Sequence, residues 1–180
     1  LPAISTRMKA GKNKITAPTS RDWAFVVNSG NNLHPGTNGR QILTVASVQM
    51  RSSSDIDENT ARISGFIEEA AAKGADIVIF PECALTGYTE DAARDVTAGQ
   101  IEDAERKIGR TCRDNAVYAI VGSPFRDGSR LYNSALVISG DGSVIERYHK
   151  IQLAEGWPDQ GDHLSVFNVN EILCSIIICH

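Results

Sequence analysis

The feature that most constrains the fold is a strand–helix–strand pattern early in the chain. Ile42–Gln49 is an apolar, β-branched run of strand length, and Ala75–Phe80 is a second such run. Between the two runs, apolar residues recur at helical spacing, after a capping signal at Asp55 and before a helix-ending Gly74. Consecutive strands that are joined through a helix pair in parallel. The pattern therefore predicts an α/β domain in which a helix covers parallel strands.

The remainder of the domain is predicted to add one more helix and then hairpins. The apolar face of that helix consists of Ile101, Ala104, Ile108 and Cys112. Turn signals at Asp127-Gly128 and Asp141-Gly142 separate strand-like runs and are typical of hairpins. The predicted strands are Val117–Val121, Leu131–Ser139, Ser143–His149, Leu164–Val169 and Ile172–Cys179. Because parallel and antiparallel connections occur together, we expect a mixed sheet.

The two ends of the chain differ from this pattern. Residues 1–40 are rich in Gly, Asn, Ser and basic side chains, so we expect a loop-rich basic extension with a short strand at Trp23–Val27. Residues 41–180 then form one domain. Leu173–Cys179 is predicted to be a buried strand, and a buried strand needs neighbours on both sides. We therefore expect the domain to be incomplete at its C-terminus.

Composition excludes several classes of protein. A net charge of −4 and a pI near 5.6 favour neither nucleic acid nor an acidic membrane as a partner. No apolar run reaches the length of about 20 residues that spans a bilayer. The four cysteines form no C-x-x-C pair and no zinc-type cluster, so we expect reduced thiols and no metal. The sequence contains no Walker loop and no G-x-G-x-x-G motif, and we expect no cofactor. The absence of a glycosylation acceptor favours a cytoplasmic location.

Three residues that could take part in catalysis lie at or just after the ends of predicted strands. Glu82 follows a buried strand, Lys150 follows Tyr148-His149, and Cys179 ends an apolar run. The carboxyl ends of strands are where open α/β sheets bind ligands. Each residue alone has an ordinary alternative, namely a loop carboxylate, a solvated lysine or a core cysteine. The other cysteines, Cys83, Cys112 and Cys174, fit the core alternative better.

Taken in order, these residues and their neighbours resemble the nitrilase, or carbon–nitrogen hydrolase, superfamily. The resemblance covers nearly all of the chain from Ile42 onward. The matching segments are Val48-Gln49-Met50, Phe80-Pro81-Glu82 with Leu85-Thr86-Gly87-Tyr88, Asn133-Ser134-Ala135, Tyr148-His149-Lys150 and Ile177-Ile178-Cys179. Five such matches in the same order are a specific signal. The resemblance implies the N-terminal half of a four-layer αββα sandwich.

The same resemblance implies a role for each site residue. Cys179 is the nucleophile that forms a thioester, Glu82 is the general base, and Lys150 stabilises the oxyanion together with the backbone N–H of His180. Glu155, in Glu-Gly-Trp, resembles a supporting glutamate of aliphatic amidases, although it follows the lysine more closely here. The implied partners are a small amide or related substrate and further copies of the chain in a homo-oligomer.

Several alternatives remain open at this stage. Nitrilases typically have tryptophan after the cysteine, so His180 favours amide or carbamoyl hydrolysis over nitrile hydrolysis. The chain could instead be an inactive fragment or pseudo-enzyme that acts only by association. It could also be an amide-hydrolysing or transferase domain of a larger protein. A Cys179–His180 dyad is excluded, because adjacent strand residues point to opposite faces. His149 and His163 are expected to be loop or strand-end residues rather than metal ligands.

Overall fold

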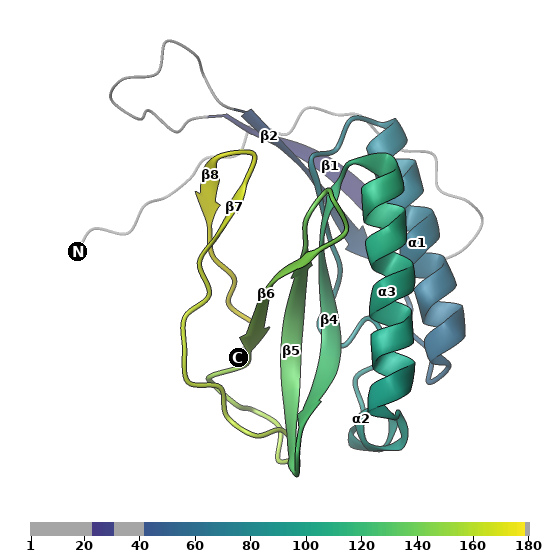
Figure 1. Cartoon of the computed structure of the whole chain (residues 1–180), viewed down its shortest axis with the longest axis vertical. Helices are drawn as coiled ribbons and strands as arrows, with labels where there is room; N and C mark the ends of the chain where they lie inside the picture. The colour runs from purple at the N-terminus through teal and green to yellow at the C-terminus, as the bar shows by residue number, and fades with distance from the viewer. Residues whose placement is uncertain (1–22, 31–41, 179–180) are drawn as a thin grey trace.

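The structure, a computed structural model, describes residues 23–30 and 42–178, with backbone only for 23–30. Two long helices cover one face of a twisted sheet, and a small hairpin lies over the other (Figure 1). The helices are α1 (Ile56–Ala72), α2 (Glu90–Asp95) and α3 (Ala98–Asn115). The strands are β1 (Trp23–Gly30), β2 (Ile42–Gln49), β3 (Ile77–Ile79), β4 (Tyr118–Asp127), β5 (Arg130–Ile138), β6 (Val144–His149), β7 (Phe167–Val169) and β8 (Ile172–Cys174).

The topology of the main sheet places the site. Its strands lie in the order β1-β2-β3-β4-β5-β6, with β2, β3 and β4 parallel and the other pairs antiparallel. The mixed sheet and the α/β class predicted from the sequence are confirmed. Because β6 is antiparallel to β5, and β5 to β4, strand β6 runs in the same direction as β3 and β4. Their carboxyl ends therefore lie at one edge, which brings the segments after β3 and β6 together.

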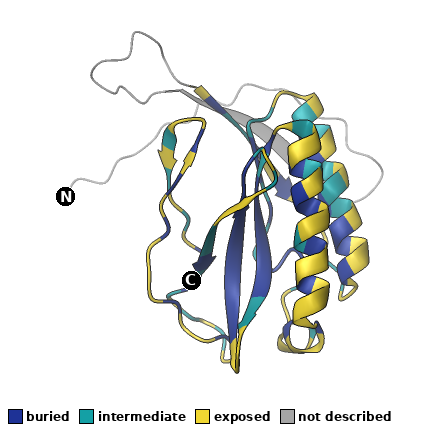
Figure 2. Ribbon diagram, in the orientation of Figure 1, coloured by how far each residue is buried: buried dark blue, intermediate teal, exposed yellow. Residues whose placement is uncertain are grey.

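Each face of the sheet has its own core (Figure 2). The core under the helices includes Ile63, Ile67, Val78, Ile108 and Val121. The opposite core lies between the sheet and the β7–β8 hairpin, and it includes Ile77, Ile120, Val137, Tyr148 and Phe167. Adjacent residues such as Ile77 and Val78 enter different cores, as expected for a strand that is buried on both faces.

Helix α1 begins and ends at the residues that the sequence indicates. Asp55 caps α1 by accepting hydrogen bonds from the backbone N–H groups of Asp57 and Glu58, and Gly74 follows the helix with φ +80°. Thr97 and Gln100 form a reciprocal capping box at the start of α3. The short helix α2 was not predicted, because a helix of this length has no room for an apolar period.

The prediction for the last apolar run was wrong in part. Only Ile172–Cys174 forms a strand, it pairs with β7 in a separate two-stranded sheet, and residues 175–178 are not in a strand. Leu173 is 66% exposed and Ile177 is 77% exposed. An apolar, β-branched sequence supplies only a preference for extended backbone, whereas a buried strand also needs partner strands. Cys179 and His180, which follow this run, lie outside the described residues.

The N-terminal strand is longer than predicted. β1 pairs with β2 along its whole length, from Trp23 opposite Gln49 to Gly30 opposite Ile42. The loop signal at residues 28–30 is therefore overridden by ladder pairing with a long neighbouring strand. The division of the chain near residue 40 stays a prediction, since most of residues 1–40 lie outside the described part. No helix in the described part is long and apolar enough to cross a membrane.

Candidate active site

A buried lysine flanked by two carboxylates lies at the shared carboxyl edge of the sheet. Glu82 follows β3, Lys150 follows β6 directly, and Glu155 lies in the next loop. The Lys150 Nζ is 2.9 Å from Oε1 of Glu82 and 2.6 Å from Oε1 of Glu155. The Lys150 side chain is 1% exposed, against 23% for Glu82 and 7% for Glu155. The structure thus brings together three of the predicted site residues.

The turn that carries Glu82 is held by β4. The backbone N–H of Phe80 donates to the carbonyl of Ile120, and that of Leu85 donates to the carbonyl of Gly122. A Cβ on Gly122 would lie 2.4 Å from both the Cys83 nitrogen and the Pro81 oxygen, so only glycine lets the turn approach so closely. Cys83 itself has φ +53°, in the left-handed region that non-glycine residues rarely adopt. The backbone next to Glu82 is therefore fixed and strained.

The charges of the cluster support one another. Burial alone lowers the pKa of Lys150, but hydrogen bonds from its ammonium to Glu155 and Glu82 outweigh burial and raise it. Burial likewise tends to raise the pKa of Glu155, yet the hydrogen bonds from Lys150 and Tyr88 lower it to about 2. Lys150 is therefore an ammonium and Glu155 a carboxylate at neutral pH. Lys150 cannot act as the base of this site.

Asn133 contacts both Glu82 and Lys150, and sequence reasoning assigned it no role. Its side chain is fully buried, its Nδ2 donates to Oε1 of Glu82 at 2.6 Å, and its backbone carbonyl accepts from the N–H of Lys150 at 2.8 Å. A signal was present in the sequence, because an asparagine in an otherwise apolar strand must find buried partners. The segment Asn133-Ser134-Ala135 was matched as a family feature only.

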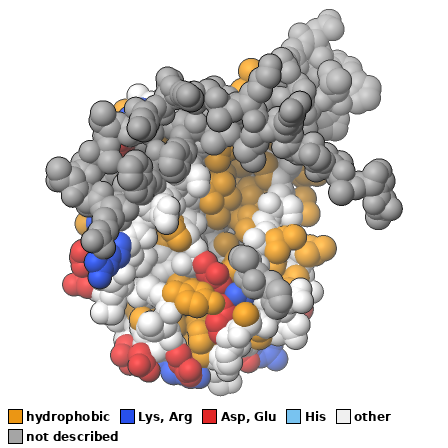
Figure 3. Space-filling model, turned by 180° about the vertical axis from the view of Figure 1, so that it is seen from behind, with side chains coloured by type: hydrophobic (Ala, Val, Ile, Leu, Met, Phe, Trp, Pro, Cys, Tyr) orange, Lys and Arg blue, Asp and Glu red, His pale blue; other side chains and the backbone are white. Residues whose placement is uncertain are grey.

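Tyr88 approaches the cluster from the solvent side. Its hydroxyl donates to Oε1 of Glu155, the oxygen that also accepts from Lys150, although the residue is 52% exposed. This hydrogen bond raises the pKa of Tyr88 to about 12. Figure 3 shows the molecule from behind relative to Figure 1, and on this face a small group of acidic and basic side chains lies among hydrophobic ones.

The described cysteines are poor nucleophiles. Burial raises the pKa of Cys83 and that of Cys112 to about 12, and it also raises the pKa of Cys174. These thiols remain protonated near neutral pH, and they lie in or against the core as expected. The roles of Cys179 as nucleophile and of His180 as backbone donor stay predictions, because neither residue is described.

The two histidines in the described part of the chain, His149 and His163, serve in packing and hydrogen bonding. The ring of His149 stacks on Tyr132 with centroids 4.2 Å apart, and its Nδ1 lies 2.7 Å from Oγ of Ser134. His163 lies beside Glu146 and Asp162 near the surface. Within the described ranges, no group of three or more His, Cys, Asp or Glu side chains could hold a metal ion.

Comparison of the sequence with known proteins identifies the family of the chain. Residues 44–172 match the model of the carbon-nitrogen hydrolase family. The chain belongs to the carbon–nitrogen hydrolase family. It is 33% identical to omega-amidase NIT2 of Homo sapiens over 110 residues, which are 61% of this chain and 40% of that protein. It is 32% identical to a nitrilase of Pyrococcus abyssi over 147 residues, covering 77% of this chain and 56% of the relative.

The fold of the carbon–nitrogen hydrolases is confirmed by a solved structure. The crystal structure of an amidase from Nesterenkonia sp. superposes with a TM-score of 0.71 at 21% sequence identity, covering 76% of this chain and 55% of that one. The prediction of a nitrilase-type α/β fold is therefore confirmed. The chain spans between 40% and 56% of the length of the two relatives named above.

Proposed function

We propose that the protein hydrolyses a carbon–nitrogen bond of a small, non-peptide amide or carbamoyl substrate through a thioester on Cys179. The observation that carries this proposal is the burial of Lys150 between Glu82 and Glu155. A buried ammonium with two carboxylates is costly to build for stability alone. It is, however, what acyl transfer from an amide requires, namely a base, a proton for nitrogen and a positive charge near the developing oxyanion.

Each proton in the proposed reaction has a defined place. Glu82 takes the proton of the Cys179 thiol while the sulfur attacks the carbonyl carbon, and Lys150 with the His180 N–H stabilises the oxyanion. Glu82 then gives the proton to the leaving nitrogen, the C–N bond breaks, and ammonia or an amine departs. Water attacks the thioester after losing a proton to Glu82. That proton returns to the sulfur when the carboxylic acid leaves, and the enzyme is regenerated.

The charge of the cluster favours this order of events. With Glu82 and Glu155 ionised and Lys150 protonated, the cluster carries one net negative charge. A free thiolate beside it would add a second negative charge at the same place. Transfer of the thiol proton to Glu82 during attack keeps the total charge constant. Concerted deprotonation is therefore favoured over a resting thiolate.

The choice of amide over nitrile rests on His180 and on the relatives. The sequence has histidine rather than tryptophan after Cys179. The relatives named omega-amidase and the amidase of Nesterenkonia support a carboxamide substrate. For the latter enzyme, a cysteine-to-alanine mutant is described in complex with butyramide. Its active site cysteine is also described as a site of covalent addition.

The proposal is tested by ammonia release from the full-length protein. Butyramide, an ω-amide of a dicarboxylic acid, a carbamoyl amino acid and a nitrile would be compared. We expect hydrolysis of at least one amide or carbamoyl compound, its loss in Cys179→Ala, and its retention in Cys112→Ala, the matched buried-thiol control. Amide hydrolysis that survives Cys179→Ala would overturn the assignment of the nucleophile.

Two further measurements separate the alternative functions. An electrophilic thiol probe should label Cys179 faster than the three buried or half-buried thiols, whereas a pseudo-enzyme should show no such preference. Ammonia release that requires an added amine or hydroxylamine acceptor would indicate a transferase. The hydrolase assignment is excluded if Cys179 is labelled no faster than the other thiols, or if ammonia is released only when an acceptor is added.

A further inference from the structure

Glu82 is held by a chain of two side chains that the proposed mechanism does not use. The Cys83 Sγ lies 3.6 Å from Oδ1 of Asn133, and the Asn133 Nδ2 lies 2.6 Å from Oε1 of Glu82. We propose that Cys83 and Asn133 form a positioning relay, in which the thiol orients the amide and the amide orients the catalytic carboxylate. This inference rests on the proposed function, since it assigns Glu82 as the base.

Only one orientation of the Asn133 amide satisfies both neighbours. An ionised carboxylate can only accept hydrogen bonds, so the NH₂ group must face Glu82. With the amide turned over, its carbonyl oxygen would lie against Oε1 of Glu82, and two acceptors would repel each other at 2.6 Å. The carbonyl oxygen therefore faces the Cys83 sulfur. A donor is needed there, because Asn133 is fully buried and a buried carbonyl oxygen without a donor is costly.

The Cys83 thiol is suited to be that donor. The residue is 1% exposed, and burial raises the pKa of its thiol to about 12, so the S–H proton is retained through the working range of pH. Its left-handed backbone, φ +53°, aims the side chain at β5 rather than at solvent. Cys83, which directly follows Glu82 in the chain, therefore helps to position Glu82 through Asn133. An S–H group is a weak donor, but it needs only to select one of two amide orientations.

The relay also determines which carboxylate oxygen is left for chemistry. Oε1 of Glu82 accepts from both Asn133 and Lys150, at 2.6 Å and 2.9 Å. Within the described residues, Oε2 of Glu82 accepts no hydrogen bond. The proton of the nucleophile should therefore pass to Oε2. Because the backbone carbonyl of Asn133 also accepts from the N–H of Lys150, one residue sets the spacing of base and cation.

The relay is tested with four variants of the full-length protein. Asn133→Ala removes the donor to Glu82, and a hydrogen bond to a charged group is worth about 1.5–3 kcal/mol, so kcat should fall roughly 10- to 100-fold with KM nearly unchanged. Cys83→Ala should show the same changes in weaker form. Cys83→Ser keeps a donor and should stay close to wild type.

Cys112→Ala is the matched control, because Cys112 is an equally buried thiol on the inner face of α3, away from Glu82. It should reproduce the loss of thermal stability of Cys83→Ala without any fall in kcat. A purely structural role for Cys83 predicts that the two variants behave alike, and that result would overturn the relay. Cys83→Ser acting like Cys83→Ala would overturn the donor role of the thiol.

A readout without turnover separates this inference from the proposed function. The rate of Cys179 alkylation by iodoacetamide is measured in each variant, because it depends on how well the neighbouring carboxylate is placed to take the thiol proton. Slower alkylation in Asn133→Ala than in Cys112→Ala supports the relay even if no tested amide is hydrolysed. Unchanged rates of alkylation and hydrolysis in Asn133→Ala overturn the relay, while loss of hydrolysis in Cys179→Ala still upholds the function.

Discussion

Lys150 and Glu155 are five residues apart in the chain, and the Lys150 Nζ lies 2.6 Å from Oε1 of Glu155. The resemblance to aliphatic amidases implies a supporting role for Glu155, although the spacing from the lysine is shorter here. The loop after β6 turns back at once, and the N–H of Ala154 donates to Oε2 of Glu155 at 3.2 Å. Both carboxylate oxygens therefore have donors, and Glu155 is placed to hold the ammonium without taking part in proton transfer.

Glu155→Gln should lower activity strongly while leaving the nucleophile in place. The neutral amide keeps the shape of the side chain but removes one of the two carboxylates that hold the Lys150 ammonium, the proposed oxyanion-stabilising group. We expect kcat to fall by about 10²-fold, the typical effect of losing one stabilising electrostatic contact. Steady-state kinetics of the full-length protein measures this. Glu90→Gln, at an exposed pair with Arg94 on α2, is the control and should be silent.

Glu155 should also contribute a stability that depends on pH. Its folded pKa of about 2 lies below its ordinary value of 4.5, so the contribution is complete above pH 4.5 and is lost as pH falls toward 2. The free energy of unfolding is measured by urea titration between pH 7 and pH 2. The difference between wild type and Glu155→Gln should be constant down to about pH 5 and then shrink. A constant difference down to pH 2 would contradict the assignment.

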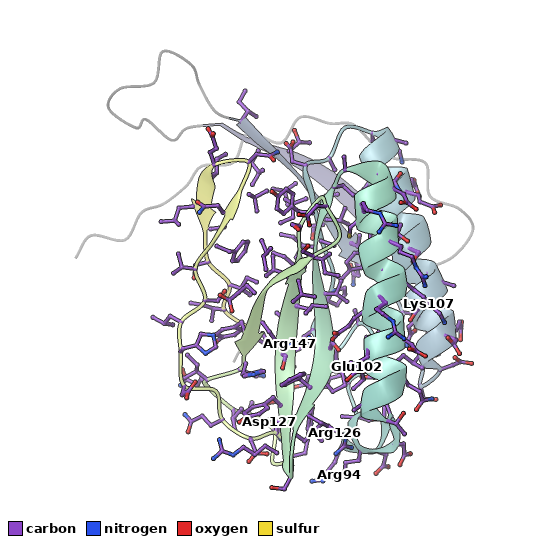
Figure 4. The ribbon with its side chains drawn as sticks, viewed as in Figure 1. Arg94, Glu102, Lys107, Arg126, Asp127 and Arg147 are labelled. Atoms are coloured by element: carbon purple, nitrogen blue, oxygen red, sulfur yellow. The ribbon has the colours of Figure 1, made fainter. Side chains whose placement is uncertain are left out.

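Lys150→Met should destabilise the protein far more than the loss of an exposed lysine. Removing the ammonium leaves Glu82 and Glu155 as like charges in a largely buried site, which costs about 3–5 kcal/mol. Lys107→Met is the matched control. Lys107 projects from α3 on the helical surface (Figure 4) and pairs with Asp57 at 2.8 Å. That pair is exposed, so its loss should cost less than about 1 kcal/mol in urea titration.

The sequence predicted the parts of the fold that depend on local periodicity. The strand from Ile42, the α1 helix with its Asp55 cap, and the face of α3 all follow from apolar spacing and capping chemistry. It could not predict how far β1 or β8 would extend. Pairing decides both, because β2 offers β1 a full-length partner while residues 175–178 join no strand.

The sequence predicted that charged residues gather at one edge of the sheet, but it did not indicate the neutral residues that contact them. Glu82 and Lys150 stand out because each follows a strand, and strand ends meet at one edge of a sheet. Asn133 and Cys83 contribute through the direction of a hydrogen bond, which depends on backbone angles such as the φ of +53° at Cys83. No pattern of residue types specifies such an angle. Geometry of this kind emerges only after the strands have been paired.

Gly122→Ala should disable the site through the backbone. The added Cβ would lie 2.4 Å from backbone atoms of Pro81 and Cys83, so the turn that carries Glu82 must move. A displacement of about 1 Å is enough to cost roughly 10²-fold in rate. Gly65→Ala in α1 is the control, because its Cβ meets nothing within 4 Å. The control should gain up to about 1 kcal/mol of stability and keep full activity. An active Gly122→Ala protein would contradict this account of the turn.

The hydroxyl of Tyr88 should lose its proton only at high pH, because it donates a hydrogen bond to the Glu155 carboxylate. The hydrogen bond to the Glu155 carboxylate raises the pKa of Tyr88 to about 12, against an ordinary value of 10. Tyrosinate absorbance between pH 9 and pH 13 measures the titration, and Tyr88→Phe identifies the contribution of this residue among the four tyrosines. In Glu155→Gln the carboxylate is gone, so the same transition should move back toward pH 10. A transition that stays near pH 12 in Glu155→Gln would mean that burial, rather than this hydrogen bond, retains the proton.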